Sequence, residues 1–184
     1  MAVRVGGGQV RGRVLKVTRG SATRPSSGRV RSALFSMLAS RVSGASVLDL
    51  YAGTGALGIE ALSRGAAHVD FVEQDSRECA TLRANLDSLG YATQARVHRM
   101  PVDRALTSLT GPYDLVVMDP PYADDALASL LERVGPLVAE DGTVAAEHDR
   151  RHPLPPAAGG LQQVTERAYG DTVLSIYRRL GGSQ

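Results

Sequence analysis

Four consecutive residues, Asp119-Pro120-Pro121-Tyr122, have groups suited to holding a flat base by an exocyclic amine. They follow the apolar run 115–118, which is typical of a buried strand. The Asp119 carboxylate can accept one N–H of such an amine, and the Pro120 carbonyl can accept the other. The prolines fix φ, so these acceptors are aimed in advance, and Tyr122 offers a face for stacking. The alternative is a loop that only leaves a strand and carries a half-buried tyrosine.

A second motif upstream has the form of a strand, a glycine-rich turn and a helix. The apolar run 47–50 leads into Tyr51-Ala52-Gly53-Thr54-Gly55, and a helix is expected to follow. The two glycines allow a tight turn and a close approach of a ligand. Free N–H groups at the start of the helix favour a polar or anionic group there. The next apolar run ends at Glu73, whose carboxylate can accept hydrogen bonds from both hydroxyls of a ribose.

Two features distinguish between the cofactors that such a loop could bind. The glycines also match G-x-G-x-x-G, and Glu73 lies about twenty residues beyond Gly53, so a dinucleotide site is an open alternative. Asp49, however, precedes the loop, where its charge would attract an ammonium group and repel a pyrophosphate. A clamp for a base amine also has a use beside a methyl donor and none beside a nicotinamide. We therefore predict S-adenosylmethionine, with a dinucleotide or a non-catalytic α/β domain as alternatives.

The elements that must position these residues alternate along the chain. Strands are expected at 46–50, 68–72, 95–99, 114–118 and 142–147, and helices at 56–64, 77–89, 103–109 and 124–134. This order predicts a parallel sheet wound by helices, with all strand carboxyl ends on one edge. Asp49, Glu73 and Asp119 should therefore converge on one crevice. Outside this pattern we expect a strand from Gln9 to Thr18 after a loose start, a helix at 29–40, and a final antiparallel hairpin at 161–168 and 172–178.

Length and composition set the broad class. The chain has 184 residues, enough for one α/β domain with a sizeable core. It has no apolar run of membrane-spanning length and no apolar signal segment, so we expect a cytoplasmic location. The single cysteine, Cys79, excludes an internal disulfide. The four histidines show no paired metal-ligand spacing, so we predict no metal site, and nothing demands more than a monomer.

Positive charge is concentrated at the N-terminus. Residues 1–48 carry nine basic side chains and no acidic one, although the formal net charge of the whole chain is only +2. Such a local field suits a polyanion, and arginine suits phosphate contacts and stacking on bases. The alternative is a basic segment that only aids solubility. We predict RNA contacts from five arginines of this segment: Arg11, Arg13, Arg24, Arg29 and Arg31.

The chain resembles the class I S-adenosylmethionine-dependent methyltransferases that methylate amines. More closely, it is similar to one bacterial family, the 16S rRNA (guanine(966)-N2)-methyltransferases. The resemblance covers nearly the whole chain and rests on stretches 8–13, 24–31, 49–64 and 119–122. It implies a Rossmann-like, seven-stranded, mostly parallel sheet with a C-terminal antiparallel hairpin. It also implies a small basic RNA-contacting extension at 1–43, made of a strand or hairpin and a helix, and a methyltransferase domain at 44–180. Residues 181–184 are expected to form a flexible tail.

The resemblance further implies methyl transfer to the N2 amine of a guanine in 16S rRNA, within the small ribosomal subunit or its assembly intermediate. Family members often have Phe where this chain has Tyr122, and stacking survives that change. The stretch after the third strand departs from the family pattern, so the adenine edge would meet the backbone of Met100 or Val102, with Gln74 nearby. The implied catalytic residues are Asp119, Pro120 and Tyr122. The implied cofactor residues are Asp49, Tyr51, Ala52, Gly53, Gly55, Glu73, Gln74, Met100, Val102 and Asp119.

Other functions remain open from the sequence. A DNA adenine or cytosine amino-methyltransferase would use the same clamp, but the chain has no evident separate domain for reading a duplex. Methylation of a protein glutamine usually goes with Asn rather than Asp at position 119. A non-catalytic RNA-binding module with this fold would not need Asp119 or the glycine turn.

Overall fold

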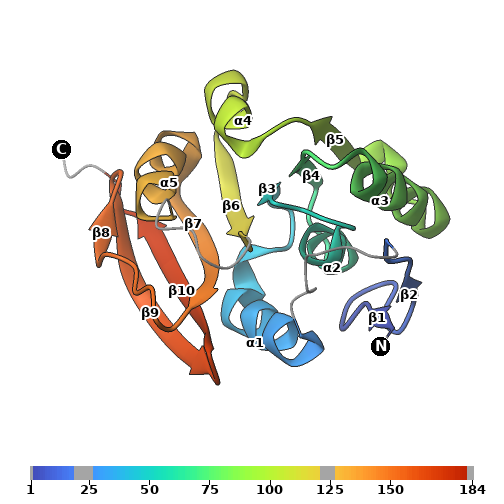
Figure 1. Cartoon of the computed structure of the whole chain (residues 1–184), viewed down its shortest axis with the longest axis horizontal. Helices are drawn as coiled ribbons and strands as arrows, with labels where there is room; N and C mark the ends of the chain where they lie inside the picture. The colour runs from blue at the N-terminus through green and yellow to red at the C-terminus, as the bar shows by residue number, and fades with distance from the viewer. Residues whose placement is uncertain (1, 19–26, 121–126, 182–184) are drawn as a thin grey trace.

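The computed structural model describes residues 2–18, 27–120 and 127–181, and their centre is one mixed sheet (Figure 1). The strand order is β5-β4-β3-β6-β7-β10-β9-β8, with β3 to β7 parallel and the last three strands antiparallel to their neighbours. The strands are β3 (Ser46–Leu50), β4 (His68–Glu73), β5 (Ala95–Arg99), β6 (Tyr113–Met118), β7 (Val138–Asp149), β8 (Ala157–Ala158), β9 (Leu161–Tyr169) and β10 (Thr172–Arg179). The predicted α/β class, parallel sheet and final hairpin are confirmed.

The strand count differs by one from the expected seven. The additional strand is β8, two residues that pair with the start of β9 at the edge of the sheet. It lies in a loop rich in proline and glycine, where so short a strand leaves no periodic signal. Strand β7 is also longer than expected, because Glu140-Asp141-Gly142 forms an irregularity within it rather than a turn before it. Asp141 there has φ of 59°.

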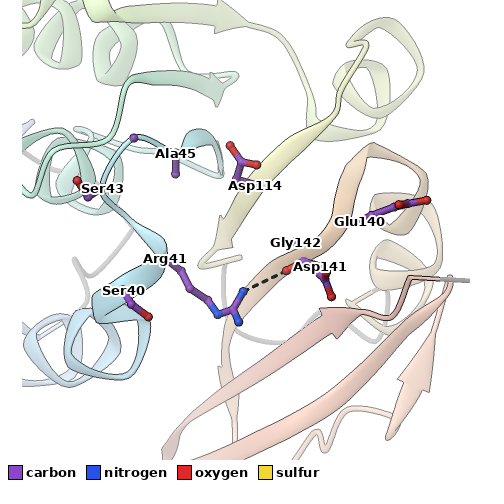
Figure 2. A pocket seen from close by; sticks show the side chains of 9 residues that line it. Ser40, Arg41, Ser43, Ala45, Asp114, Glu140, Asp141 and Gly142 are labelled. Atoms are coloured by element: carbon purple, nitrogen blue, oxygen red, sulfur yellow. Dashed lines mark hydrogen bonds between the residues drawn. The ribbon is translucent and has the colours of Figure 1, made fainter.

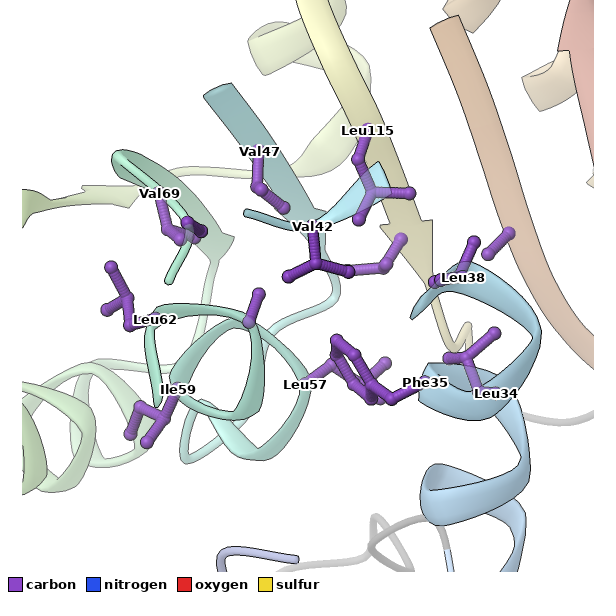
Figure 3. Packing of buried hydrophobic residues seen from close by; sticks show 14 of the residues in the cluster. Leu34, Phe35, Leu38, Val42, Val47, Leu57, Ile59, Leu62, Val69 and Leu115 are labelled. Atoms are coloured by element: carbon purple, nitrogen blue, oxygen red, sulfur yellow. The ribbon is translucent and has the colours of Figure 1, made fainter. Parts of the chain in front are cut away.

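Helices cover both faces of the sheet, with α1 and α2 on one side and α4 and α5 on the other (Figure 1). Leu48, Val116 and Met118 point toward α4 and α5, whereas Val47 and Leu115 point toward α1 and α2. Because both faces are buried, the inner strands are apolar along their length. Figure 3 shows this packing on the α1 and α2 side. The helices are α1 (Gly28–Leu38), α2 (Ala56–Ser63), α3 (Ser76–Leu89), α4 (Val102–Ser108) and α5 (Leu127–Val134), with 3₁₀ turns at Ala39–Arg41, Ala92–Gln94 and Gly135–Leu137.

The N-terminal segment, for which a strand or hairpin was expected, forms a small antiparallel ribbon, and no continuous strand runs from Gln9 to Thr18. Its strands are β1 (Val3–Arg4) and β2 (Val14–Leu15), and residues 7–12 turn between them. Gly8 explains the turn, because its φ is 77° and a Cβ there would lie 1.8 Å from the Ser63 carbonyl oxygen. The start of the chain is therefore ordered against α2.

Backbone hydrogen bonds and apolar contacts attach the ribbon to the rest of the molecule. Gln9 N donates to the Ser63 carbonyl at 2.7 Å, and Val10 N donates to the Ser63 hydroxyl at 3.1 Å. Val5 and Leu15 are buried in the same core cluster as Val47 of the central sheet. The basic segment thus lies on the side of the domain that carries α2. None of the helices in the described ranges is long and apolar enough to cross a membrane.

Candidate active site

Three acidic residues meet at the carboxyl edge of the parallel strands. Leu50 of β3 pairs with Val72 of β4 on one side and with Met118 of β6 on the other. Asp49, Glu73 and Asp119 therefore stand at the ends of three adjacent strands. Their charges influence one another, since Asp119 and Glu73 both help to raise the pKa of Asp49. The structure brings together the three acids that the sequence placed in one crevice.

The turn after β3 adopts backbone conformations that few residues tolerate. Tyr51 has φ of 61°, which is unusual for a residue with a side chain. Gly55, with φ of 89°, is the N-cap of α2, and a Cβ there would lie 2.2 Å from Leu82. Gly53 has φ of 54°, and a Cβ there would meet nothing within 4 Å. Gly55 is thus required by packing, whereas the space beside Gly53 would admit a ligand close to the backbone.

Asp49 is the most unusual group of the site. Its side chain is 1% exposed, and Oδ2 accepts a hydrogen bond from Gly58 N at 2.8 Å. Within the described part of the chain, Oδ1 is buried and has no hydrogen-bond partner. Burial is the main reason that the pKa of Asp49 rises to about 8, opposed by the Gly58 hydrogen bond and reinforced by Asp119 and Glu73. A buried carboxylate with one unused oxygen fits an ammonium group.

Glu73 supports the glycine turn from the neighbouring strand. Its Oε2 accepts a hydrogen bond from Gly53 N at 2.9 Å, and its Oε1 accepts one from Asp75 N at 2.8 Å. A carboxylate oxygen can accept a second hydrogen bond, so both oxygens can still receive a ribose hydroxyl. Glu73 can therefore position the turn and read a ribose at the same time.

The expected base clamp begins at the end of β6. Asp119 is half-buried and Pro120 is buried, directly after Met118. Because side chains alternate along a strand and Val117 faces α1 and α2, Asp119 also faces that side, as does Asp49 two residues after Val47. Asp119, expected to hold the base amine, and Asp49, expected to hold the ammonium group, are thus on the same side of the sheet. Tyr122 lies outside the described residues.

The three residues expected beside the adenine differ in their surroundings. Met100 N already donates to the Glu73 carbonyl at 3.1 Å, and the side chain packs against the core on the α4 side. Val102 is the first residue of α4, and an N–H at that position lacks an intrahelical acceptor. Gln74 is exposed next to Glu73. Of the two backbone donors, Val102 is therefore the better placed.

The predicted RNA-contacting arginines divide into two groups. Arg11, Arg13 and Arg29 are exposed, and Arg24 lies outside the described residues. Arg31 departs from the expectation, because it is only 4% exposed and lies 3.5 Å from Glu60, which is also buried. Burial lowers the pKa of Arg31, and the Glu60 charge opposes that shift. Arg31 supports the fold in this structure and does not face a solvent-accessible phosphate site.

Glu60 is a residue whose role the sequence reasoning missed. It accepts a hydrogen bond from Gly6 N at 2.7 Å and pairs with Arg64 at 2.8 Å in addition to Arg31. It therefore joins the ribbon, α1 and α2. The signal was present, because α2 is apolar almost all round and a lone acid within such a helix must be paired.

Glu147 is a second acidic residue near the site that was not predicted from the sequence. The last residue pair of β6 and β7 is Met118 with Ala146, so Asp119 and Glu147 follow side by side on the two strands. Glu147 is 5% exposed. The sequence does contain a signal for it, because Glu147 stands at the carboxyl end of a predicted parallel strand, as Asp119 does.

An open hollow of about 500 Å³ lies at the opposite end of the strands (Figure 2). Arg41, Asp114, Glu140 and Asp141 contribute to its lining, and Arg41 donates to the Asp141 carbonyl at 3.1 Å. Ligands of parallel α/β sheets bind at the carboxyl edge, so this hollow is separate from the candidate site. No group of three or more His, Cys, Asp or Glu side chains in the described ranges is arranged to hold a metal ion.

Comparison with known proteins gives one family and one fold. The family model described as conserved hypothetical protein 95 matches residues 3–178. YlbH of Bacillus subtilis (strain 168) is 38% identical over 185 residues, which cover 97% of this chain and 100% of that protein. Ribosomal RNA small subunit methyltransferase D of Escherichia coli (strain K12) is 36% identical over 180 residues, which cover 96% of this chain and 90% of that protein.

Solved structures agree with this result. The structure of yhhF from Escherichia coli has a TM-score of 0.88 at 32% identity and covers 98% of this chain and 99% of its own. The RNA methyltransferase from Salinibacter ruber, solved in complex with S-adenosyl-L-homocysteine, shares the fold with a TM-score of 0.67 at 14% identity. The expected class I methyltransferase fold is confirmed.

Proposed function

The chain belongs to the family described as conserved hypothetical protein 95, and we propose that it methylates the exocyclic N2 amine of a guanine in 16S rRNA, with S-adenosylmethionine as the donor. The observation that carries the proposal is the convergence of Asp49, Glu73 and Asp119 on the edge that holds the glycine turn. A relative named as a small-subunit rRNA methyltransferase, matched along most of both chains, supports the substrate class.

Each part of the cofactor has a matching group at this edge. The ammonium would pair with the unused oxygen of Asp49, and the ribose hydroxyls would reach Glu73. The backbone of the turn from Tyr51 to Gly55 would line the amino-acid portion, with Ala52 between strand and turn. The adenine would lie between Gln74 and the Val102 N–H. Bound S-adenosylmethionine supplies an electrophilic methyl group on a sulfonium centre.

Asp119 and Pro120 would then prepare the nucleophile. The N2 amine of guanine is a poor nucleophile because its lone pair is delocalised into the ring. Hydrogen bonds from its two N–H groups to the Asp119 carboxylate and the Pro120 carbonyl favour a pyramidal nitrogen with a free lone pair. Methyl transfer would form the C–N bond and break the S–CH₃ bond, S-adenosylhomocysteine would be the leaving group, and the methylated nitrogen would then lose a proton to water. Asp119 stabilises the positive charge that develops on nitrogen, so positioning and electrostatics carry most of the rate.

The exposed arginines would supply the RNA contacts. A guanine in folded RNA must leave its stack to enter the clamp, which costs a few kcal/mol. Arg11 and Arg13 lie on the ribbon beside α2, and Arg29 lies at the start of α1, so phosphate contacts there would offset that cost. The small ribosomal subunit, or its assembly intermediate, would be the partner of a monomeric enzyme.

A nucleoside assay tests the proposal. The protein is incubated with S-adenosylmethionine and small ribosomal subunits from a strain that lacks the enzyme, and the digested RNA is analysed by mass spectrometry. We expect N2-methylguanosine with the wild-type protein and none with Asp119→Ala, which removes the acceptor of the clamp. A wild-type protein that leaves the RNA unmodified but methylates an amine in DNA would overturn the proposal.

A further inference from the structure

A buried asparagine joins the N-terminal segment to the glycine turn. Asn85 lies in the middle of α3 and is 1% exposed. Its Oδ1 accepts a hydrogen bond from Lys16 N at 2.8 Å, and its Nδ2 donates to the Lys16 carbonyl at 3.1 Å. Nδ2 also donates to the Thr54 carbonyl at 3.0 Å. Both N–H groups of the amide are used, and the reversed orientation would place an oxygen against two carbonyls, so the contacts fix one arrangement.

The two segments that Asn85 joins belong to different ligands in the proposed reaction. Thr54 lies between Gly53 and Gly55, in the turn that would bind the cofactor. Lys16 directly follows the ribbon that carries the exposed Arg11 and Arg13.

The residues that follow Lys16 also contact α3, through the side chain of Thr18. The Thr18 hydroxyl lies 3.0 Å from Glu78 Oε2 and 3.0 Å from the Thr81 hydroxyl. This second contact holds the segment on α3 but does not involve the glycine turn. Within the described part of the chain, Asn85 is thus the side chain whose hydrogen bonds reach both Lys16 and the glycine turn.

We propose that Asn85 is a positioning residue that couples RNA binding at the ribbon to cofactor binding at the glycine turn. The inference rests on the proposed function. Because one side chain holds Lys16 and Thr54 together, a ligand that stabilises this joined arrangement at either segment also stabilises it at the other. Linkage makes the effect reciprocal, so RNA strengthens cofactor binding by the same factor as the cofactor strengthens RNA binding.

The coupling can be measured with a cofactor product that cannot react. Equilibrium dialysis gives the Kd of tritiated S-adenosylhomocysteine without and with saturating unmethylated small subunits. We expect the ratio of the two Kd values to be roughly fivefold or more for the wild type, as is typical of coupled sites. For Asn85→Ala we expect a ratio close to one.

Two further variants separate coupling from folding. Asn85→Asp keeps the size of the side chain and the acceptor for Lys16 N, but it puts an oxygen against the Lys16 and Thr54 carbonyls. It should also bring the ratio of the two Kd values close to one, and the Tm of each variant shows whether that variant has folded. Thr18→Val removes the hydroxyl contacts to α3 and leaves the Asn85 hydrogen bonds in place, so its ratio should equal that of the wild type.

The outcomes distinguish this inference from the proposed function. If Asn85 had only a structural role, its replacement would lower Tm and weaken the binding of both ligands, but the ratio of the two Kd values would stay at the wild-type value. That result would overturn the inference. A wild-type protein that methylates small subunits with a ratio of one would also overturn it and leave the proposed function intact. Failure of the wild-type protein to bind small subunits would overturn both.

Discussion

Substitution of Asp49 by Asn should change stability and cofactor affinity in opposite directions. The buried carboxyl has a pKa raised to about 8, mainly by its burial. In the unfolded chain an aspartate has a pKa of about 3.9. Near neutral pH the unfolded chain therefore holds an ionised Asp49, whereas the ligand-free native protein holds it mostly protonated. Folding takes up a proton at this residue, and that uptake opposes folding.

The magnitude follows from the interval between the two pKa values. At pH 7 the solution lies about three units above the unfolded pKa, and at about 1.36 kcal/mol per unit the opposing free energy is at most on the order of 4 kcal/mol. Asp49→Asn keeps an oxygen to accept the hydrogen bond from Gly58 N and removes the ionisation. We expect the ligand-free variant to be more stable by about 1–4 kcal/mol, which raises Tm by at least about 2 °C in a chain of this length.

The pH dependence of this stability difference shows whether the ionisation of Asp49 causes it. A carboxyl whose native pKa is raised contributes stability below its unfolded pKa and loses that contribution as pH rises toward the native pKa. The advantage of Asp49→Asn should therefore be small at pH 4, grow up to about pH 8 and change little above it. Thermal unfolding of both proteins across this range, without ligand, measures the difference. A variant that is less stable than the wild type at pH 7 would refute the reasoning.

The same substitution should weaken binding of the cofactor. A neutral carboxamide cannot pair with a buried ammonium, and a hydrogen bond to a charged group contributes about 1.5–3 kcal/mol. This corresponds to a Kd for S-adenosylhomocysteine that is roughly tenfold to a hundredfold higher, which titration calorimetry can measure. An unchanged Kd would show that the ammonium binds elsewhere, even if the gain in stability were observed.

The remaining predictions concern the ribbon, the buried ion pairs and the turn. Reversal of Arg11 and Arg13 to Glu should weaken binding to small subunits and reduce the slope of log K against log salt by roughly 1 to 2. The Kd for S-adenosylhomocysteine should stay the same, and Arg167→Glu, on exposed β9, should change neither quantity. Glu60→Gln leaves a buried guanidinium without its charge partner and should cost about 3–5 kcal/mol in chemical denaturation; a cost close to that of an exposed glutamate would contradict this role. Gly53→Ala should cost only about 1–3 kcal/mol of stability, because the added methyl meets open space in the absence of ligand. It should nevertheless abolish S-adenosylhomocysteine binding in calorimetry, and retained binding would exclude the approach of the cofactor to this residue.

The sequence predicted the central sheet because its signals are local. Runs such as 46–50 and 95–99 are short and apolar or alternating, and the observed strands begin and end at those residues. The positions of Asp49, Glu73 and Asp119 then followed from the rule that parallel strands end at one edge. For the ribbon, the sequence predicted no more than a strand or hairpin, because β1 and β2 have two residues each and owe their order to contacts with Ser63 of α2. Such contacts join residues far apart in the chain and leave no periodic signal.

Arg31 and Asn85 show why polar residues are the hardest to assign from sequence. Arg31 has the type and the neighbours of an RNA-contacting residue, yet its partner is Glu60, which lies 29 positions away in another helix. Asn85 has no motif at all, and its importance comes from the two backbone segments that meet at its amide. A charged or amide side chain can be exposed to a ligand or buried in a network, and only the fold decides between these.

The arrangement of these networks bears on how the enzyme would recognise its substrate. The ribbon is attached to α2 through Ser63 and Glu60 and to α3 through Asn85, and these two helices flank the glycine turn. A basic segment on a flexible linker would raise the local concentration of RNA without affecting the geometry of the cofactor site. The observed attachment instead holds the ribbon that carries Arg11 and Arg13 against the two helices that flank the glycine turn. Movement of the ribbon on binding RNA would act on buried hydrogen bonds next to the turn, and this is the route by which the proposed coupling would link substrate affinity to cofactor affinity.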